Sequence, residues 1–399
     1  MRLAIYYPWV YLTSGAERTI LEIARRSRHS VTVFTNRYEP EATFPELKDV
    51  DIRVQGEVTV KRSLAGVTSA FGKILTQRLD LDEFDALLVV CEGLGDLAAL
   101  RSRIPTFNLC LTPLRIAFDP VYRRRYLDDC PPVRRAVIEL GCRFFRAFDR
   151  LAWRRYQHVF AISEEIRGRI LAGKLTTPDR LSVLNPGIEL SSFTPGTPAE
   201  KTFFVPGRIM WTKNLELAIQ AFQRFREGRS DAAEWRLRIA GIVDKKSEPY
   251  LQRLRDLAGG DPAIEFRLRP SDAEMREFYQ RCFATLFTAF NEDWGLVIIE
   301  AMASAKPVVA VDRGGPREII RNEQDSLLAA PDPASFASAM QRLADDSNFY
   351  VRLSAAAVQG SKRFGWPAFV EALDEAIDRG ARTARRPRLV TTQAVEASS

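Results

Sequence analysis

Two carboxylates flank a glycine in the second half of this 399-residue chain. Glu292 and Glu300 stand eight residues apart, with Gly295 between them, so we expect one before a helix and the other about a turn inside it. A glycine lets the backbone approach a ligand closely, because it has no Cβ. The following amides, on Leu296 and Val297, would form a helix N-terminus, where the dipole favours anions. The pattern predicts a phosphate site between two carboxylates.

Two cations stand upstream, in VPGRIMWTKN, where Arg208 and Lys213 follow Gly207 at the end of an expected strand. Cations there suit a diphosphate leaving group, because the negative charge that develops on such a group as it departs must be stabilised. The alternative makes Arg208 and Lys213 ordinary surface charges and Glu292 a turn residue. The order of the two motifs and their shared fold context favour the anion site.

The elements that must position these residues alternate between strands and helices. Nine short apolar runs predict strands: RLAIYY, SVTVFT, ALLVVC, HVFAIS, KTFFVPG, WRLRIAG, AIEFRL, ATLFTAF and KPVVAVD. Amphipathic stretches between them predict parallel sheets covered by helices. The pattern restarts after Pro186-Gly187, amid turn signals. We therefore expect an α/β protein with two doubly wound, Rossmann-like domains facing each other across a ligand-binding cleft.

The expected domain boundaries follow from this restart. Residues 1–180 form the first domain and residues 181–365 the second, which carries the anion site. A helix over 366–380 follows a Gly-Trp-Pro break and is expected to cross back to the first domain. The Arg- and Pro-containing, then polar tail 381–399 is expected to be disordered.

Composition excludes several kinds of site. The five cysteines are scattered without a C-x-x-C pair, and there are two histidines, His29 and His158. This argues against a disulfide framework, a zinc site or a histidine triad, so we expect no metal. No apolar run is long enough to span a membrane, and the first residues lack a signal-peptide pattern. We expect a cytoplasmic protein.

One segment, residues 122–157, holds ten arginines against four acidic residues, which accounts for six of the chain's seven net positive charges. An apolar stripe recurs there at helical spacing: Val133, Val137, Leu140, Phe144, Phe148 and Leu151. Two interpretations stay open, a peripheral contact with anionic membrane lipids and a core-packing helix with a solvated basic face. Nucleic-acid binding is disfavoured, because no interleaved aromatic platform or known module accompanies the charge.

The motifs, taken in order, resemble those of a large family. They are SGAERTILEIA, FAISEEIRGRI, NPGIELSSFTP, GRIMWTKN as a G-R-x4-K motif, and the EDWG wording at 292–295 with Glu300. Over nearly the whole chain the sequence resembles the retaining glycosyltransferases of group 1, which have the GT-B fold and an E-x7-E signature. The resemblance assigns the segment Phe290–Ile320 to the donor nucleotide.

The resemblance implies metal-independent hexosyl transfer with retention at the anomeric carbon, the leaving diphosphate deprotonating the acceptor. It implies no cofactor, since the sugar nucleotide is a substrate. By position, Glu300 would hold the ribose and Glu292 the donor sugar, while Arg208 and Lys213 neutralise the diphosphate. The other donor-binding positions that it implies are Gly15, Gly207, Asp293, Trp294, Gly295, Leu296 and Val297.

The stretch LCLTPLRIAFD resembles a C-H-T-P-x-R-x-x-x-D motif of enzymes similar to bacterial polysaccharide mannosyltransferases, which favours a GDP-mannose donor. Arg115 fits this motif, but Leu111 replaces its histidine and cannot hydrogen-bond a sugar. Ser14 replaces the first glycine of the usual pair. These three residues mark the acceptor or sugar side. Altered activity and simple packing both remain open for Leu111.

The leading function is thus transfer of a hexose, with mannose favoured, from a sugar nucleotide to a glycan or polyprenyl-linked glycan in polysaccharide or glycoconjugate biosynthesis. A sugar-nucleotide 2-epimerase of the same fold is a second class, although two histidines leave little material for extra acid/base groups. A non-catalytic sugar-nucleotide-binding relative is a third.

Overall fold

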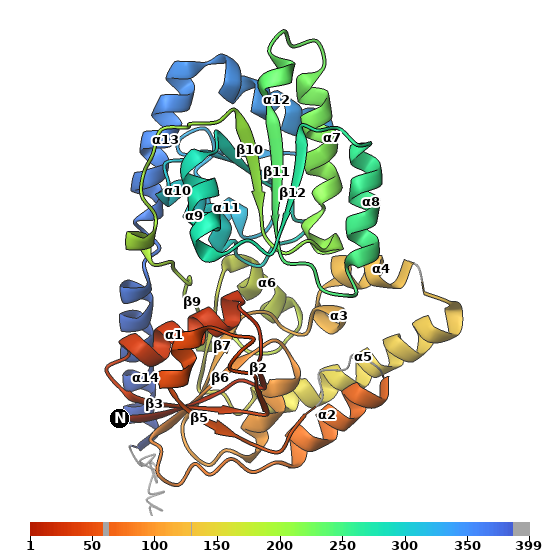
Figure 1. Ribbon diagram of the computed structural model, residues 1–399. Coiled ribbons are helices and arrows are strands. Elements are labelled where there is room, and N and C mark those ends of the chain that lie inside the picture. Colours follow the sequence, from red (N-terminus) through yellow and green to blue (C-terminus); the bar gives the residue numbers. More distant parts are fainter. Residues whose placement is uncertain (59–63, 129, 386–399) are drawn as a thin grey trace, which may run out of the picture.

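The computed structural model describes residues 1–58, 64–128 and 130–385. They form two sheets of parallel strands, each flanked by helices, one above the other in Figure 1. All nine strands predicted from the apolar runs are present. The expected α/β architecture with two doubly wound sheets is therefore confirmed.

The first sheet has the order β5-β3-β1-β6-β7-β8-β9. Its strands are β1 (Arg2–Tyr6), β3 (Ser30–Thr35), β5 (Asp51–Val54), β6 (Ala86–Cys91), β7 (Thr106–Cys110), β8 (His158–Ala161) and β9 (Leu181–Val183). A two-stranded pair, β2 (Trp9–Val10) and β4 (Arg37–Tyr38), lies beside it. Because β9 pairs with β8, the first sheet ends beyond residue 180, where the first domain was expected to stop.

The second sheet has the order β12-β11-β10-β13-β14-β15. Its strands are β10 (Thr202–Pro206), β11 (Arg236–Gly241), β12 (Ile264–Leu268), β13 (Ala284–Phe287), β14 (Val308–Val311) and β15 (Leu327–Ala329). Strands β10, β13 and β14 are buried along their whole length, which explains their continuous apolar sequences.

Helices cover both sheets. Those before the join are α1 (Gly15–Arg26), α2 (Leu64–Thr76), α3 (Arg115–Phe118), α4 (Pro120–Asp128), α5 (Pro132–Trp153) and α6 (Glu164–Ala172). Those after it are α7 (Leu215–Arg226), α8 (Glu248–Ala258), α9 (Asp272–Arg281), α10 (Leu296–Ala303), α11 (Pro316–Ile319), α12 (Pro333–Asp345) and α13 (Ser347–Ser361). Figure 1 shows α5 and α2 running together away from the sheet of the first domain.

The last helix, α14 (Trp366–Arg385), returns to the first domain and lies along α1 (Figure 1). The Asp374 carboxylate accepts hydrogen bonds from the Ser27 hydroxyl at 2.8 Å and the Arg28 amide at 2.9 Å. The helix is longer than expected: it continues through Ala381, which is buried, and ends at Arg385. Of the expected disordered tail, residues 386–399 lie outside the described part of the chain.

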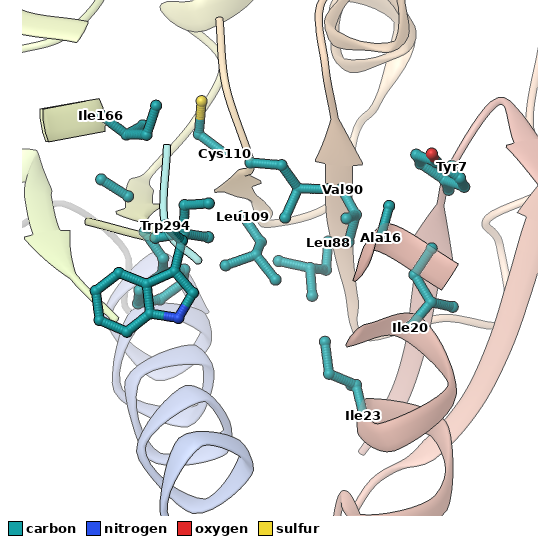
Figure 2. Packing of buried hydrophobic residues seen from close by; sticks show 14 of the residues in the cluster. Tyr7, Ala16, Ile20, Ile23, Leu88, Val90, Leu109, Cys110, Ile166 and Trp294 are labelled. Atoms are coloured by element: carbon teal, nitrogen blue, oxygen red, sulfur yellow. The ribbon is translucent and has the colours of Figure 1, made fainter. Parts of the chain in front are cut away.

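The two domains share one apolar core around the join. Trp294, from the second domain, belongs to the same buried cluster as Leu88, Leu109 and Cys110 of the first (Figure 2). The chain also passes between the domains twice, and the two passages lie side by side. The Ile188 amide of one donates to the Phe364 carbonyl of the other at 3.0 Å. These contacts fix the second-domain loops against the first domain.

Candidate functional site

Glycines shape the loops around the predicted anion site. Gly207 and Gly295 have φ values of +128° and +132°, a region that favours glycine. A Cβ on Gly314 would lie 2.5 Å from the carbonyl oxygen of Glu292, and one on Gly315 would lie 2.2 Å from that of Trp294. The Gly314-Gly315 loop therefore packs directly beneath the 292–294 turn and holds it in place.

Lys213 and Glu292 meet at the centre of this site. Lys213 ends a short 3₁₀ turn after β10, and Glu292 lies in the loop after β13, so the two come from neighbouring strands of one sheet. The Lys213 Nζ lies 2.6 Å from Glu292 Oε2, and both side chains are half-buried. Burial alone would raise the pKa of Glu292, but the Lys213 ammonium, with Arg115 and the exposed Arg208, holds that pKa below its ordinary value. Glu292 is therefore ionised at neutral pH.

The N-terminus of α10 lies next in the chain. Backbone bonding of this helix starts at Ile298, whose amide donates to the Gly295 carbonyl at 3.0 Å. The amides of Leu296 and Val297 therefore belong to the first turn, where helix amides lack intrahelical partners. A Cβ built on Gly15 would lie 3.6 Å from the Leu296 side chain, so the start of α1 faces this turn from the first domain. The predicted anion site thus lies between the two domains.

Glu300 lies in the same helix in a different environment. The Tyr279 hydroxyl, from α9, donates a hydrogen bond to Glu300 Oε2 at 2.7 Å. Burial raises the pKa of Glu300, although this hydrogen bond opposes the shift. The two signature carboxylates therefore differ, because Glu292 pairs with a cation and the half-buried Glu300 accepts a hydrogen bond from a phenol.

A polar network from the first domain reaches the 291–293 turn. Arg115 donates to the backbone carbonyl of Asn291 at 2.7 Å and lies 3.2 Å from the Asp119 carboxylate. The Asp119 carboxylate also accepts from the Asn291 side-chain amide at 3.3 Å. Arg115 therefore acts in this structure as a bridge between the domains.

Arg169 makes the second bridge. Its guanidinium is 5% exposed and donates to Asp293 Oδ1 at 2.7 Å and to the Thr112 hydroxyl at 2.8 Å. Burial raises the pKa of Asp293, and the charge of Arg169 works against that shift. The Glu318 carboxylate of α11 adds a third contact, accepting the Glu164 and Glu165 amides at the N-terminus of α6.

Some residues predicted for the site are instead enclosed or hydrogen-bonded by other parts of the protein. Trp294 is 4% exposed, and its indole N–H donates to the Pro186 carbonyl at 2.9 Å. A side chain so enclosed offers no surface to a nucleotide here, so Trp294 and Asp293 hold the interface. Leu111 is buried in the first-domain core, which favours the packing interpretation of this residue. The Ser14 side chain caps α1 by accepting from the Ala16 amide.

A cavity of about 610 Å³ lies beside the Lys213–Glu292 pair. Its lining comes from α3 and α4 of the first domain and from the loops after β10, β13 and β14 of the second. These residues are Arg115, Pro120, Val121, Tyr122, Arg124, Arg125, Asp128, Trp211, Thr212, Phe290, Asn291, Glu292 and Arg313. The sequence analysis gave site roles to Arg115 and Glu292 among them and named Phe290 as the start of the donor segment, but it gave no role to the side chains of Tyr122 and Trp211.

Residues 190–359 match the family model described as "Glycosyl transferases group 1". Over most of its length the chain is similar to alpha-1,3/1,6-mannosyltransferase ALG2 of Homo sapiens, with 25% identity over 90% of this chain and 91% of that protein. A D-inositol 3-phosphate glycosyltransferase of Thermobispora bispora is 32% identical over 52% of this chain. The chain matches about half of that relative's length, 53%.

Solved structures share the fold. Anabaena HepE, in complex with UDP and glucose, superposes with a TM-score of 0.74 at 16% identity, over 95% of this chain and all of that one. A sucrose-phosphate synthase of Thermosynechococcus elongatus also has a TM-score of 0.74, at 15% identity over 96% of this chain. The fold is therefore GT-B. Together with the family model and the mannosyltransferase relative, it supports a glycosyltransferase of group 1.

Two further observations concern the described residues alone. None of their helices combines the length and the apolar content that crossing a membrane requires. Within the same ranges, His, Cys, Asp and Glu side chains do not gather in groups of three suited to a metal ion.

Proposed function

We propose that this protein transfers a hexose from a sugar nucleotide to a glycan or lipid-linked glycan, with retention of anomeric configuration and without a metal ion. The observation that carries this proposal is the Lys213–Glu292 ion pair at 2.6 Å, in the part of the second domain that faces the first and close in sequence to the N-terminus of α10. A cation and a helix terminus beside one carboxylate suit a substrate with a diphosphate and a sugar.

In the proposed reaction the bond between the anomeric carbon and the diphosphate oxygen breaks. A bond forms from the acceptor hydroxyl oxygen to the same face of that carbon, and the hydroxyl proton passes to the leaving diphosphate. Lys213 and Arg208 stabilise the negative charge that develops on the diphosphate, aided by the Leu296 and Val297 amides. When the Lys213 ammonium moves from Glu292 to bind the phosphate, Glu292 accepts hydrogen bonds from the donor sugar.

The donor would be GDP-mannose. The Thr112-Pro113-x-Arg115 wording and the similarity to a mannosyltransferase both favour mannose. Glu300 would hold the ribose hydroxyls, because its carboxylate already accepts the Tyr279 hydroxyl and keeps acceptor capacity beside it.

A thermal-shift screen across GDP-, UDP- and ADP-sugars tests the donor assignment, since a ligand that binds only the folded state raises its stability. We expect GDP-mannose to raise the unfolding midpoint most, and Lys213→Ala to remove most of that shift. The matched control is Lys362→Ala, an exposed lysine at the C-terminal end of α13 and outside the site motifs. A larger shift with a UDP-sugar would reject the GDP-mannose assignment and keep the transferase.

We further propose that α5 rests on an anionic membrane surface. The apolar stripe predicted as a possible core face is mostly exposed: Val133 is 79% exposed, Leu140 68% and Phe144 59%. Phe148 alone of the six turns inward, packing edge-to-face on Phe71 of α2. Leaving large apolar side chains in water is unfavourable, so an exposed stripe on a protruding helix suggests a contact.

The charges on this helix favour lipid over protein. Exposed arginines such as Arg143 and Arg154 flank the apolar stripe, and each contributes about 1 kcal/mol near an anionic leaflet. An amphipathic helix with basic flanks is typical of peripheral membrane binding. A lipid-linked acceptor would then be presented beside α4, which precedes α5 in the chain.

Co-sedimentation with vesicles tests this contact. We expect binding to vesicles of phosphatidylglycerol and phosphatidylcholine but not of phosphatidylcholine alone, and expect Val133→Ser/Leu140→Ser to abolish it. Val351→Ser, at a 65% exposed valine on α13, serves as the matched control. Failure of the wild type to sediment with anionic vesicles at moderate salt, or a dimer that the double variant breaks, would argue against the membrane.

A further inference from the structure

The cavity beside the Lys213–Glu292 pair has an excess of positive charge. Four arginines line it, Arg115, Arg124, Arg125 and Arg313, against the carboxylates of Asp128 and Glu292. Arg115 and Glu292 are already paired, with Asp119 and Lys213. Among the described residues, no carboxylate lies within 4.0 Å of the guanidinium groups of the other three arginines. Positive charge is therefore available to a ligand at this wall.

Aromatic rings also line this cavity. The rings of Tyr122 and Trp211, from different domains, lie 5.5 Å apart, and Phe290 adjoins Trp211. The guanidinium carbon of Arg125 lies 3.8 Å from the centre of the Phe290 ring and 5.5 Å from that of Trp211. A guanidinium in contact with aromatic rings still has planar N–H donors that can bind an oxyanion bidentately.

We propose that this cavity binds the acceptor, and that the acceptor is a glycan carrying an anionic group, a phosphate or a carboxylate. Tyr122 and Trp211 pack against the apolar face of a sugar ring, while Arg124, Arg125 and Arg313 bind the anion. This inference rests on the proposed transferase function. It adds the chemical class of the second substrate, which the donor motifs do not specify.

The position of the cavity suits an acceptor and not the nucleotide. The cavity shares Glu292 with the proposed donor site, but the amides of α10 and Glu300, assigned to phosphate and ribose, are not among its lining residues. A glycan hydroxyl placed here would therefore lie next to Glu292, the residue proposed to hold the donor sugar. GDP and the acceptor should bind at the same time.

Titration calorimetry with three probes tests the assignment: α-mannose 1-phosphate, methyl glucuronoside and neutral methyl α-mannoside. Each is titrated into the protein with and without saturating GDP. We expect one or both anionic sugars to bind at least about tenfold tighter than the neutral one, a difference of about 1.4 kcal/mol, with GDP present or absent. Which of the two binds tighter identifies phosphate or carboxylate as the natural anion.

The variant Arg124→Gln/Arg125→Gln should weaken the anionic sugar about tenfold and leave GDP affinity unchanged. Arg134→Gln, an exposed arginine outside the cavity, is the matched control and should change neither. Equal affinity for neutral and anionic sugars, displacement of the sugar phosphate by GDP, or an unaffected double variant would each overturn the anionic acceptor. Absence of binding of GDP, UDP and ADP alike would instead count against the transferase, so the two failures are distinguishable.

Discussion

The loop at 290–295 and the helix α5 both carry charged side chains, yet their charges are arranged differently. In the loop, each charged side chain has a defined partner: Glu292 pairs with Lys213, and Asp293 with Arg169. On α5, exposed arginines stand beside exposed apolar side chains such as Val133 and Leu140. The first arrangement fixes geometry for chemistry. The second leaves apolar side chains exposed to water, which is unfavourable unless another surface covers them.

The largest expected effect contrasts two neighbouring phenylalanines on α5. Phe145 is 7% exposed and packs edge-to-face against Phe118, whereas Phe144 is 59% exposed. We expect Phe145→Ala to cost about 3–5 kcal/mol of unfolding free energy, because it leaves a core cavity. Phe144→Ala should cost about 0.5 kcal/mol or less, as surface changes usually do. Denaturant unfolding measures both, and similar losses would mean that the stripe is buried.

The next effect concerns the paired loop. Lys213→Ala removes the cation from the proposed leaving group and leaves Glu292 without its partner. We expect kcat for donor turnover to fall about 10²–10³-fold, the usual cost of losing one charge-stabilising donor. Steady-state kinetics at saturating donor give this value. A change in KM alone would assign Lys213 to ground-state binding instead.

The two signature carboxylates should respond oppositely to pH. Burial raises the pKa of Glu300, so its ionised form destabilises the fold, and stability is lost as pH rises through that raised pKa. Glu300→Gln stays neutral and keeps an oxygen for Tyr279. We therefore expect the unliganded variant to unfold at a higher temperature than wild type at pH 8, with a smaller difference at pH 5. Its donor affinity should nevertheless be lower.

For Glu292 the sign reverses, because its pKa is lowered. Its pairing stabilises the fold above its unfolded-state pKa, and that stability is lost as pH falls through the folded pKa. Glu292→Gln should therefore lower the unfolding temperature at pH 8, unlike Glu300→Gln. The same shift in both variants would mean that the two carboxylates share one environment.

The smallest effect should come from Tyr279→Phe, which removes the hydroxyl bound to Glu300 and keeps the ring. A hydrogen bond of this kind contributes about 0.5–1.5 kcal/mol, so we expect donor KM to rise about two- to tenfold with kcat nearly unchanged. Phe278→Leu, one residue away on α9, controls for altered packing. An unchanged KM would separate Glu300 from donor binding.

Most of the sheet architecture was predictable from local sequence, because buried parallel strands are continuous apolar runs. The strands β5, β7, β9 and β15 of the two large sheets, and the short pair β2 and β4, were missed. Strand β7 includes the polar Asn108, whose side-chain amide donates to the buried Asp96, and β5, β9 and β15 have only three or four residues. Motifs marked both Lys213 and Glu292, but their direct pairing depends on the adjacency of β10 and β13, which the sequence did not predict. The bridge from Arg169 to Asp293 spans 124 residues and two domains, and no pattern within either segment predicts it.

The side chains of the cavity show the same limit. Tyr122 and Trp211 are unremarkable in sequence and meet only when the domains close on each other. The exposure of the α5 stripe was likewise undecided, because helical periodicity gives a face but not what covers it. Tertiary structure supplies that information for both regions.

The central claim is that the paired loop carries out retaining transfer from a sugar nucleotide. NMR of GDP-mannose turnover by the wild type and by Lys213→Ala tests it most directly. We predict that the mannosyl product forms with the α configuration of the donor, and that the variant is at least about 100-fold slower. A β-linked product, a donor epimerised at C2 without transfer, or equal rates in the two proteins would contradict the account.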